Sequence, residues 1–542
     1  TLFPYTTLFR SYGDAYSDDV YCQYAHESNA KIFQQDGFSP LYDEGWNFET
    51  IRKENLFLQK VGNCEMDESL RERFKAEVRA MRAWTYLGMT MTFGKVPLIT
   101  EVLDYNSPNI PRDEVSVIRD FIMKELTEAA AILPEKYAGG YPNEKGRITK
   151  YACLSLKARA ALYFGDYALA ESTAKEVMDK GGFSLFKISS LSDAQKKEAE
   201  EMSLYIDFAE KGIDKDEFVK GMFNYEALWH TENANPDNPE YIMTRQYAAS
   251  SWDYQDMTRY TSMRPNQLGG WSSVTPTQNL VDAYWGVDGH SVPQLPTPEE
   301  RAKAYNQIKA DLDAYQKPEG EAKFIAFCQE KIKNGTLKDY KYIQEFRNRD
   351  SRMYVSILMP FKSWYESNYG DKFVYEWIKN GNNESKTGFN FRKMLSLEND
   401  ANGDGQATGD YPCIRYAEIL LIYAEAHTQT TGYDAATEAA LNQLRDRCGM
   451  PDVPSGLSKE EGLKLIQNER RIELAGEGFR GDDMTRYSDD YWKEHMNNVP
   501  IMTPDGDTEL TMKWSSRMRL KPIPQTAIDL NPLLAGDQNP GY

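Results

Sequence analysis

The stretch that decides the fold is GRITKYACLSLKARAALYFGDYALAESTAKEVMD, residues 146–179. In its first half, apolar residues recur at i, i+4, i+7 and i+8 and form one stripe of a helix: Leu154, Ala158, Ala161 and Leu162. Gly165-Asp166 breaks this helix, and an alanine-rich helical pattern then runs as far as Gly181-Gly182. A helix, a short turn and a second alanine-rich helix predict a hairpin of the tetratricopeptide type.

A second hairpin of the same type is predicted over residues 412–448. There PCIRYAEILLIYAEAHTQ is followed by a TTGY turn and then by DAATEAALNQLRDRCG. Further helices are predicted at 66–93, 114–133 and 459–476. The hairpins are degenerate and unevenly spaced, so we expect a mostly α fold, a tetratricopeptide-like helical scaffold (about 66–185 and 410–480), and not a regular solenoid.

The segment between about 185 and 410 differs from the rest of the chain in composition and periodicity. Pro, Gly, Asn and aromatic residues become more frequent, helical periodicity weakens, and candidate strands such as 352–358 appear. We therefore expect an irregular, aromatic-rich loop region with minor β structure, packed on the scaffold and carrying binding groups. No low-complexity linker divides the chain, which predicts a single unit over 12–542. The terminal IPQTAIDLNP is expected to strap the tail, about 515–542, over the scaffold.

Charge and composition exclude several classes of partner. The 542 residues include 63 Lys and Arg against 83 Asp and Glu, a net charge of −20. Such a surface repels nucleic-acid phosphates and anionic lipid head groups, so we expect no nucleic acid and no basic membrane patch. No run of 18 apolar residues is present, so no membrane-spanning helix is expected. The six cysteines lie far apart and are expected to be small buried hydrophobes, with at most one disulfide.

The sequence carries no signature of catalysis or zinc binding. Its five histidines are scattered, and HExxH, GxxxxGK[ST] and GxSxG motifs are missing. Arg415 and Arg471 lie in predicted apolar helices and have four glutamates one or two turns away: Glu418, Glu425, Glu469 and Glu473. We interpret these groups as internal salt-bridge networks. Two alternatives stay open: an all-helical glycoside hydrolase, because carboxylates are abundant, and a tetratricopeptide scaffold that binds other proteins.

One short motif matches the opening of a calcium loop. Asp400, Asn402 and Asp404 alternate with Ala, Gly and Gly in the D-x-N-x-D-G pattern, which places oxygen ligands at alternate positions. Position twelve, where such a loop has a bidentate Glu, is Tyr411, and Asp410 comes one residue early. Two interpretations stay open: a structural calcium ion bound by these three residues, or a plain turn before the following helix.

Candidate ligand-binding residues are concentrated between Tyr247 and Trp285. Three rings there are flanked by Ser, Asp, Gln and Gly: Trp252, Tyr254 and Trp271. The irregular backbone at Gly269-Gly270 favours presentation of the Trp271 indole by a loop. Because sugar-binding sites combine aromatic faces with a few polar groups, we expect these three rings to contact ligand. Tyr284 and Trp285 follow an apolar helix-like run and are expected in the core.

A second candidate ligand site is the N-terminal loop SPLYDEGWNF, which contains Tyr42 and Trp46. The alternative is that Trp46 anchors the helix that follows this loop.

Seven stretches in order, spread over nearly the whole chain, carry a resemblance to a known family: AEVRAMRAWTYLGMTMTFGKVPLIT (76–100), the hairpin at 146–179, PTQNLVDAYWGVDG (276–289), RNRDSRMYVSIL (347–358), YPCIRYAEILLIYAEA (411–426), NERRIELAGEGFRGDDMTRY (468–487) and LKPIPQTAIDLNPLLAGDQNPGY (520–542). Together they resemble the SusD/RagB family of outer-membrane nutrient-binding proteins. A single motif of this kind is weakly specific, but seven in the same order are highly specific.

The resemblance implies non-enzymatic work at the cell surface. Family members are lipid-anchored on the extracellular face of the outer membrane and cap a TonB-dependent transporter of the SusC type. They capture oligosaccharides and deliver them to that transporter, which the tetratricopeptide-like face contacts. We therefore expect an oligosaccharide-binding lipoprotein with no catalytic residues and no cofactor other than a structural calcium. A peptide-binding, RagB-like member is the alternative.

The first eleven residues, TLFPYTTLFRS, match the in-frame translation of a sequencing-adapter oligonucleotide. We interpret residues 1–11 as an assembly artefact and leave them out of the fold prediction. We accordingly expect that the natural start, with its signal peptide and lipid-accepting cysteine, is missing from this sequence. Cys22 does not replace that cysteine, because DDVYC lacks the small apolar residues of a lipoprotein signal.

Overall fold

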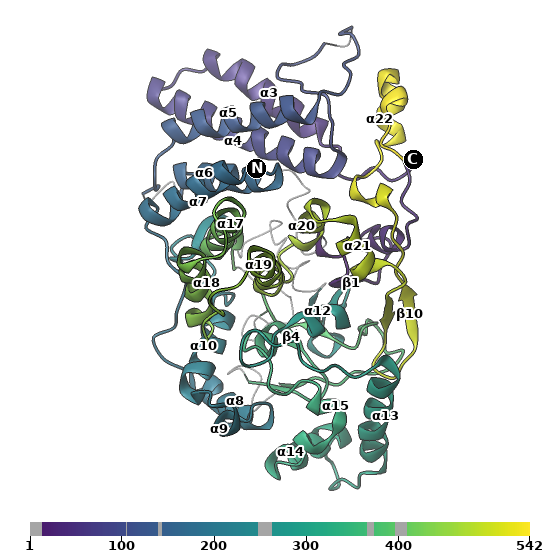
Figure 1. Cartoon of the computed structure of the whole chain (residues 1–542). Helices are drawn as coiled ribbons and strands as arrows, with labels where there is room; N and C mark the ends of the chain where they lie inside the picture. Colours follow the sequence, from purple (N-terminus) through teal and green to yellow (C-terminus); the bar gives the residue numbers. More distant parts are fainter. Residues whose placement is uncertain (1–12, 105, 139–143, 248–262, 366–372, 396–408) are drawn as a thin grey trace.

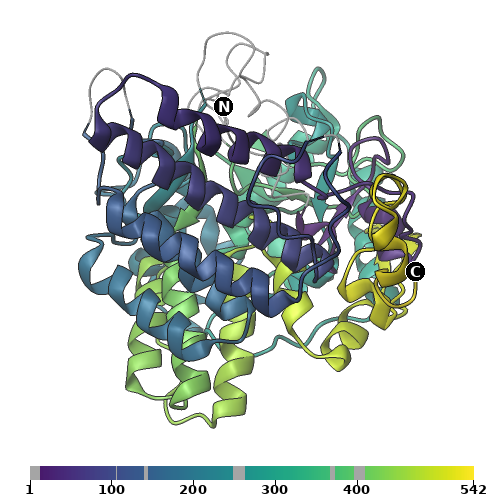
Figure 2. The same cartoon turned by 90° about the horizontal axis from the view of Figure 1, so that it is seen from above.

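Antiparallel helices packed side by side form the scaffold of the protein (Figure 1). The computed structural model describes residues 13–104, 106–138, 144–247, 263–365, 373–395 and 409–542. The scaffold consists of α3 (Phe48–Lys60), α4 (Glu68–Phe93), α5 (Val115–Ile132), α6 (Lys150–Tyr163), α7 (Tyr167–Lys180), α17 (Tyr416–Thr430), α18 (Ala435–Arg447) and α19 (Lys459–Glu473). Each helix packs against the next as far as α18, and α19 packs against α17. The view from above shows this layer as parallel rows of ribbon (Figure 2).

The hairpin predicted at 146–179 is confirmed as α6 and α7. The Thr149 hydroxyl caps α6 by accepting a hydrogen bond from the Ala152 N–H at 3.2 Å, and the Asp166 carboxylate caps α7 through the Leu169 N–H at 3.2 Å. Gly165 turns the chain between them with a φ of +74°, where glycine has no steric penalty. Helix α7 packs directly against α17, so the two predicted hairpins are neighbours although far apart in sequence.

The start of the second hairpin differs from the prediction. Residues Tyr411–Arg415 form strand β8, which pairs antiparallel with β2 (Tyr241–Arg245), and α17 begins only at Tyr416. Pro412 has no N–H to donate within a helix, which favours the extended conformation there. Arg415 therefore ends a buried strand. The prediction that it lies inside a helix was wrong.

The middle of the chain contains more helix than its weak periodicity predicted. Its helices are α8 (Asp193–Glu201), α9 (Phe208–Lys211), α10 (Lys215–Ala227), α12 (Gln278–Ala283), α13 (Pro298–Ala314), α14 (Lys323–Lys333), α15 (Lys341–Gln344) and α16 (Met353–Ser356). The predicted strand at 352–358 was wrong for most of its length, because only β4 (Ile357–Leu358) is extended. Several helices here are short or polar, so they give little periodic signal.

Strands in the described residues form five two-stranded antiparallel pairs. Besides β2–β8, they are β1 (Val20–Cys22) with β3 (Val274–Pro276), β4 with β7 (Asn390–Phe391), β5 (Ser363–Trp364) with β6 (Phe373–Val374), and β9 (Pro500–Met502) with β10 (Thr508–Thr511). The remaining helices are α2 (Ala30–Gln34), α20 (Arg480–Arg486), α21 (Asp489–Met496) and α22 (Gln525–Leu530). The β1–β3 pair joins the N-terminal segment to the middle of the chain, and the fold class is the mostly helical one predicted.

Five of the six cysteines are buried, as predicted, whereas Cys64 is exposed; all six thiols are free. Tyr284 is also buried and Trp285 partly buried, as expected for core residues. None of the described helices is long and apolar enough to cross a bilayer.

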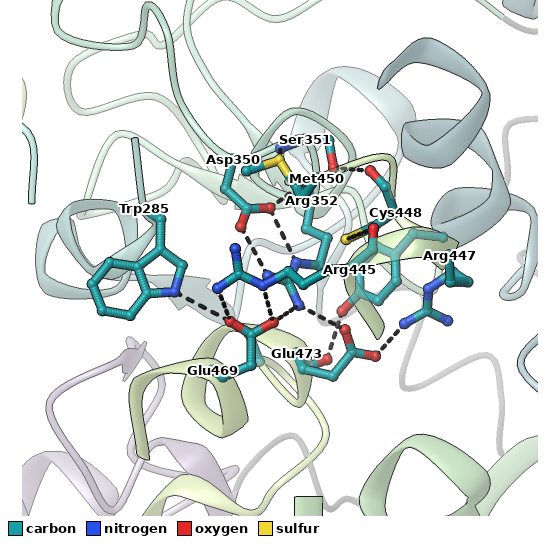
Figure 3. Close-up of polar contacts among 12 residues, drawn as sticks. Trp285, Asp350, Ser351, Arg352, Arg445, Arg447, Cys448, Met450, Glu469 and Glu473 are labelled. Atoms are coloured by element: carbon teal, nitrogen blue, oxygen red, sulfur yellow. Dashed lines mark hydrogen bonds and ion pairs between the residues drawn. The ribbon is translucent and has the colours of Figure 1, made fainter. Parts of the chain in front are cut away.

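A buried ion network joins the scaffold to the middle of the chain (Figure 3). Glu473 of α19 lies at its centre and pairs with Arg415 at 2.8 Å, with Arg352 at 3.0 Å and with Arg447 of α18. Glu469, one turn earlier, pairs with Arg352 at 2.8 Å. Burial alone would raise the pKa of Glu473, but the surrounding arginines hold it well below its usual range. The network therefore stays charged. The prediction that these groups form internal salt bridges is confirmed.

Several charged residues of the predicted networks pair with residues on other elements, and not with the nearby charges on their own helix. Glu418 pairs with Arg159 of α6 at 2.6 Å, and Glu425 pairs with Arg486 of α20. Arg471 reaches the N-terminal segment, where it binds Asp18 at 2.7 Å. These pairs link different elements, because a helix buried on several sides presents its charges to neighbouring helices.

We expect Glu473→Gln to lower the free energy of unfolding by about 3–5 kcal/mol, because it leaves several buried arginines without a counter-charge. The matched control is Glu460→Gln in the same helix, whose exposed i,i+4 pair with Lys464 at 3.0 Å contributes only about 0.5 kcal/mol or less. Denaturant unfolding of the two variants measures the difference. Equal losses would show that the network does not stabilise the fold in this way.

Candidate functional site

A cavity of about 730 Å³ opens beside α4. One face of this helix lines it, through residues spaced three or four apart: Met81, Trp84, Thr85, Gly88, Met91 and Thr92. The other walls come from the N-terminal segment 13–47, from residues 478–492, which include α20, and from the tail at 518–521. Its volume lies within the range of about 300–1,000 Å³ that is usual for ligand pockets.

Gly88 keeps the α4 wall of this cavity open. It is exposed in the middle of a helix whose adjacent residues are buried, and a Cβ placed on it would meet no heavy atom within 4 Å. Glycine inside a helix costs about 1 kcal/mol relative to alanine. Close packing does not require a glycine at this position, so its effect is to leave room in the cavity.

Three indole rings contribute apolar walls. Trp46 packs edge-to-face on Phe93 with ring centroids 5.0 Å apart. Trp84 projects from α4, and Trp492 of α21 donates its indole N–H to the Met484 carbonyl at 2.6 Å. Trp84 and Trp492 are 7% and 1% exposed, so the partly exposed Trp46 offers most of the ring surface for a flat, amphipathic ligand.

A fixed polar cluster forms part of the cavity wall. The Lys521 ammonium lies 3.0 Å from the Glu44 carboxylate and 3.8 Å from the centroid of the Tyr16 ring, and the Tyr16 hydroxyl donates to Glu44. Burial alone would raise the pKa of Glu44, but Lys521 and the hydrogen bonds hold it below its usual value. Glu44 is therefore ionised, and each partner is already engaged.

The tail and the N-terminal loop close this side of the molecule. The Lys521 N–H donates to the Thr92 carbonyl at 2.8 Å, and the Asn539 amide donates to the Phe93 carbonyl at 2.9 Å, so the tail lies across the C-terminal end of α4. The Thr526 hydroxyl donates to Asp43 at 2.9 Å. Both ends of the described chain thus meet at the cavity.

The structure separates the two aromatic residues predicted in the N-terminal loop. Trp46 lines the cavity and also packs against the scaffold core, and its contact with a ligand stays a prediction. Tyr42 packs against Phe38 with centroids 5.1 Å apart and does not line the cavity.

Trp271 is 45% exposed and is presented by a well-braced loop. The Gln23 side-chain amide donates to the carbonyls of Trp271 at 3.0 Å and Ser272 at 2.8 Å. Ser272 has a φ of +46°, an unfavourable value for a residue with a Cβ. The next residue, Ser273, donates to Glu27 of the cavity wall at 3.0 Å, which connects this loop to the cavity.

The other predicted site residues lie outside the described parts of the chain. This applies to the ligand candidates Trp252 and Tyr254 and to the calcium candidates Asp400, Asn402 and Asp404. Beyond the motif, Asp410 accepts a hydrogen bond from the Tyr247 N–H at 3.1 Å, and the Tyr411 hydroxyl donates to the Glu477 carbonyl at 3.0 Å. Calcium binding therefore stays a prediction.

Sequence reasoning missed Trp84, Gly88, Trp492 and Lys521 as cavity residues. A mid-helix glycine one turn after a tryptophan was a visible signal in α4. Trp492 and Lys521 had no such signal in the sequence, because only the folded chain places them beside α4.

The comparisons with known proteins agree with this architecture. A SusD-like protein of Formosa agariphila is 22% identical over 475 residues, which cover 85% of this chain and 73% of the relative. A SusD-like protein of Bacteroides fragilis has a similar structure, with a TM-score of 0.75, 24% identity, and coverage of 100% of this chain and 94% of the other. A second B. fragilis structure, of a SusD-like carbohydrate-binding protein, has a TM-score of 0.67 at 19% identity and covers 97% and 92% of the two chains.

A tetratricopeptide-like scaffold with a preformed cavity and fixed aromatic walls defines a helical binding protein. The model of the SusD family matches residues 239–542, more than half of the sequence. The chain belongs to the SusD family.

We expect Gly88→Leu to narrow the cavity at α4 without unfolding the protein. A leucine side chain has open space there and favours the helix by several tenths of a kcal/mol, so the melting temperature should stay equal or rise. Ligand binding should fall at least tenfold, as measured by calorimetry with the oligosaccharide that a binding screen selects. Gly62→Leu is the matched control, because Gly62 in the 3-10 turn Val61–Asn63 also has open space but lies outside the cavity lining. Unchanged binding by Gly88→Leu would place the ligand elsewhere.

Proposed function

We propose that this protein captures oligosaccharides without chemical turnover. The observation that carries the proposal is the cavity beside α4, where indole faces stand next to carboxylate, hydroxyl and ammonium groups. Sugars present apolar ring faces and many hydroxyls, and such a site matches both. Membership of the SusD family and the carbohydrate-binding relative in B. fragilis support the same conclusion. The exposed Trp271 would contact a longer ligand that extends from the cavity.

The cavity chemistry favours binding over hydrolysis. A glycosidase needs a general acid whose pKa is raised, facing a second carboxyl group across the scissile bond. Glu44 has a lowered pKa and is held by Lys521, Tyr16 and Asn29. Asp43, the neighbouring carboxylate, accepts a hydrogen bond from Thr526. Glu44 is therefore poorly suited to proton transfer, which argues against the glycoside hydrolase alternative.

We propose the outer face of the outer membrane as the site of action, with attachment through an N-terminal lipid. The captured ligand would pass to a SusC-like TonB-dependent transporter. The helical hairpins α6–α7 and α17–α18 are the proposed contact with that transporter. Family membership supports these three steps, and the strongly acidic composition argues against direct attraction to anionic lipids.

Peptide binding is the second candidate function. The excess of carboxylates in the cavity lining would suit a basic peptide as well as a sugar. The density of indole rings favours the sugar, since stacking on a ring face is the contact that a sugar makes best.

We expect the purified protein to bind its oligosaccharide and return it intact. Time-resolved chromatography of the bound oligosaccharide over a day at 37 °C should show no shortened products. The Gly88→Leu variant serves as a control, because a contaminating hydrolase would act equally in both samples. Steady release of shorter sugars by the original protein and not by this variant would contradict the proposal.

A further inference from the structure

We propose that the cavity selects uncharged, hydroxyl-rich oligosaccharides and rejects those that carry carboxylate or sulfate groups. This inference rests on the proposed function and adds the class of ligand. It follows from the balance of charges in the cavity wall and from the partners that its cations already have.

Carboxylates outnumber cations in the lining. Four acidic residues contribute to it, Glu27, Asp43, Glu44 and Asp482, against two basic residues, Arg519 and Lys521. The protein as a whole carries a net charge of −20, so the surroundings do not offset this local excess. A cleft with one dominant sign of charge concentrates its field within the cleft and excludes ions of the same sign.

The two cations in the wall are engaged to different degrees: Lys521 is held closely by Glu44, whereas Arg519 makes a longer ion pair through its Nε alone. The Lys521 ammonium is 3.0 Å from the Glu44 carboxylate and lies over the rings of Tyr16 and Phe38, at 3.8 Å and 5.1 Å from their centroids. Arg519 pairs with Asp489 of α21 at 3.4 Å, and Asp489 does not line the cavity. A uronate or sulfate entering the cavity would have to displace Glu44 before it gained Lys521 as a counter-charge, and near Arg519 it would still meet the excess of carboxylates in the lining.

The same wall suits a neutral polyhydroxyl ligand. Ionised carboxylates only accept hydrogen bonds, and each sugar hydroxyl has one to donate. The Asp43 carboxylate receives one hydrogen bond from Thr526 on one oxygen and has further acceptor capacity. Hydrogen bonds to a charged acceptor are stronger than those between neutral groups, so neutral sugars gain from the charge that repels anionic ones.

The electrostatic step can be tested without any ligand, by collisional quenching of Trp46 fluorescence with caesium and iodide ions. The Trp46 signal is the difference between the protein and its Trp46→Phe variant. With each quenching constant expressed relative to that of free N-acetyltryptophanamide, we expect caesium to quench Trp46 at least twice as strongly as iodide at equal ionic strength. In the double variant Asp43→Asn with Asp482→Asn, quenching of Trp46 by iodide should at least double. If that double variant melts early, Asp43→Asn alone should show a smaller change of the same sign.

The control replaces two exposed carboxylates of α8, as Asp193→Asn with Glu200→Gln. Helix α8 lies at the opposite end of the molecule from α4 (Figure 1). This control should leave the quenching of Trp46 unchanged. Equal quenching by the two ions in the original protein, or an equal effect of both double variants, would overturn the proposed selection.

A second experiment compares a panel of neutral oligosaccharides with the same panel after oxidation of the primary hydroxyls to carboxylates. We expect neutral members to bind at least tenfold more tightly than their oxidised counterparts. The inference would be overturned if an oxidised oligosaccharide bound more tightly than its neutral counterpart and the Gly88→Leu variant lost that binding. If quenching behaves as expected and no neutral member binds, the cavity charge is as proposed and the oligosaccharide function is wrong.

Discussion

The buried pairing of Glu473 with Arg415, Arg352 and Arg447 is the constraint on which the rest of the structure depends. Each arginine comes from a different part of the chain: the end of β8, the segment before α16, and α18. An ionised group inside a protein is tolerated only when its counter-charges are correctly placed. The network can therefore form only when scaffold helices and middle region are docked in one arrangement. The network thus fixes how these two regions dock on each other.

The N-terminal segment is held by an extension of the same principle. Asp18 pairs with Arg471 of α19 at 2.7 Å and with Arg480 of α20 at 2.9 Å, while the Asp14 carboxylate accepts the N–H groups of Gly478 at 2.9 Å and Arg480 at 2.7 Å. These contacts place residues 13–47 against α4 and leave a hollow between them. Ionic contacts and hydrogen bonds between segments far apart in the sequence therefore hold the walls of the cavity in place. A preformed wall spares the ligand the cost of ordering it.

Local patterns in the sequence predicted the scaffold well. The caps at Thr149 and Asp166, and the turn at Gly165, depend on neighbouring residues only, so periodicity and turn chemistry were sufficient. The strand at 411–415 was mistaken for helix because its pairing with β2 is a tertiary contact. For the cavity, the prediction reached Trp46 and no further. Trp492 and Lys521 lie beside Trp84 only because distant segments of the chain pack together. Residue spacing along the sequence does not predict such packing.

The central claim is that a rigid, ion-paired scaffold presents a preformed cavity that holds an intact oligosaccharide. A crystal structure of the protein soaked with the oligosaccharide selected by a binding screen tests it most directly. The account predicts an unbroken sugar chain with a ring against Trp46 or Trp84 beside Gly88, and side chains of Glu473 and Arg415 in the positions described above. A sugar bound at another face with the cavity empty, a cleaved sugar, or a rearranged network would contradict it.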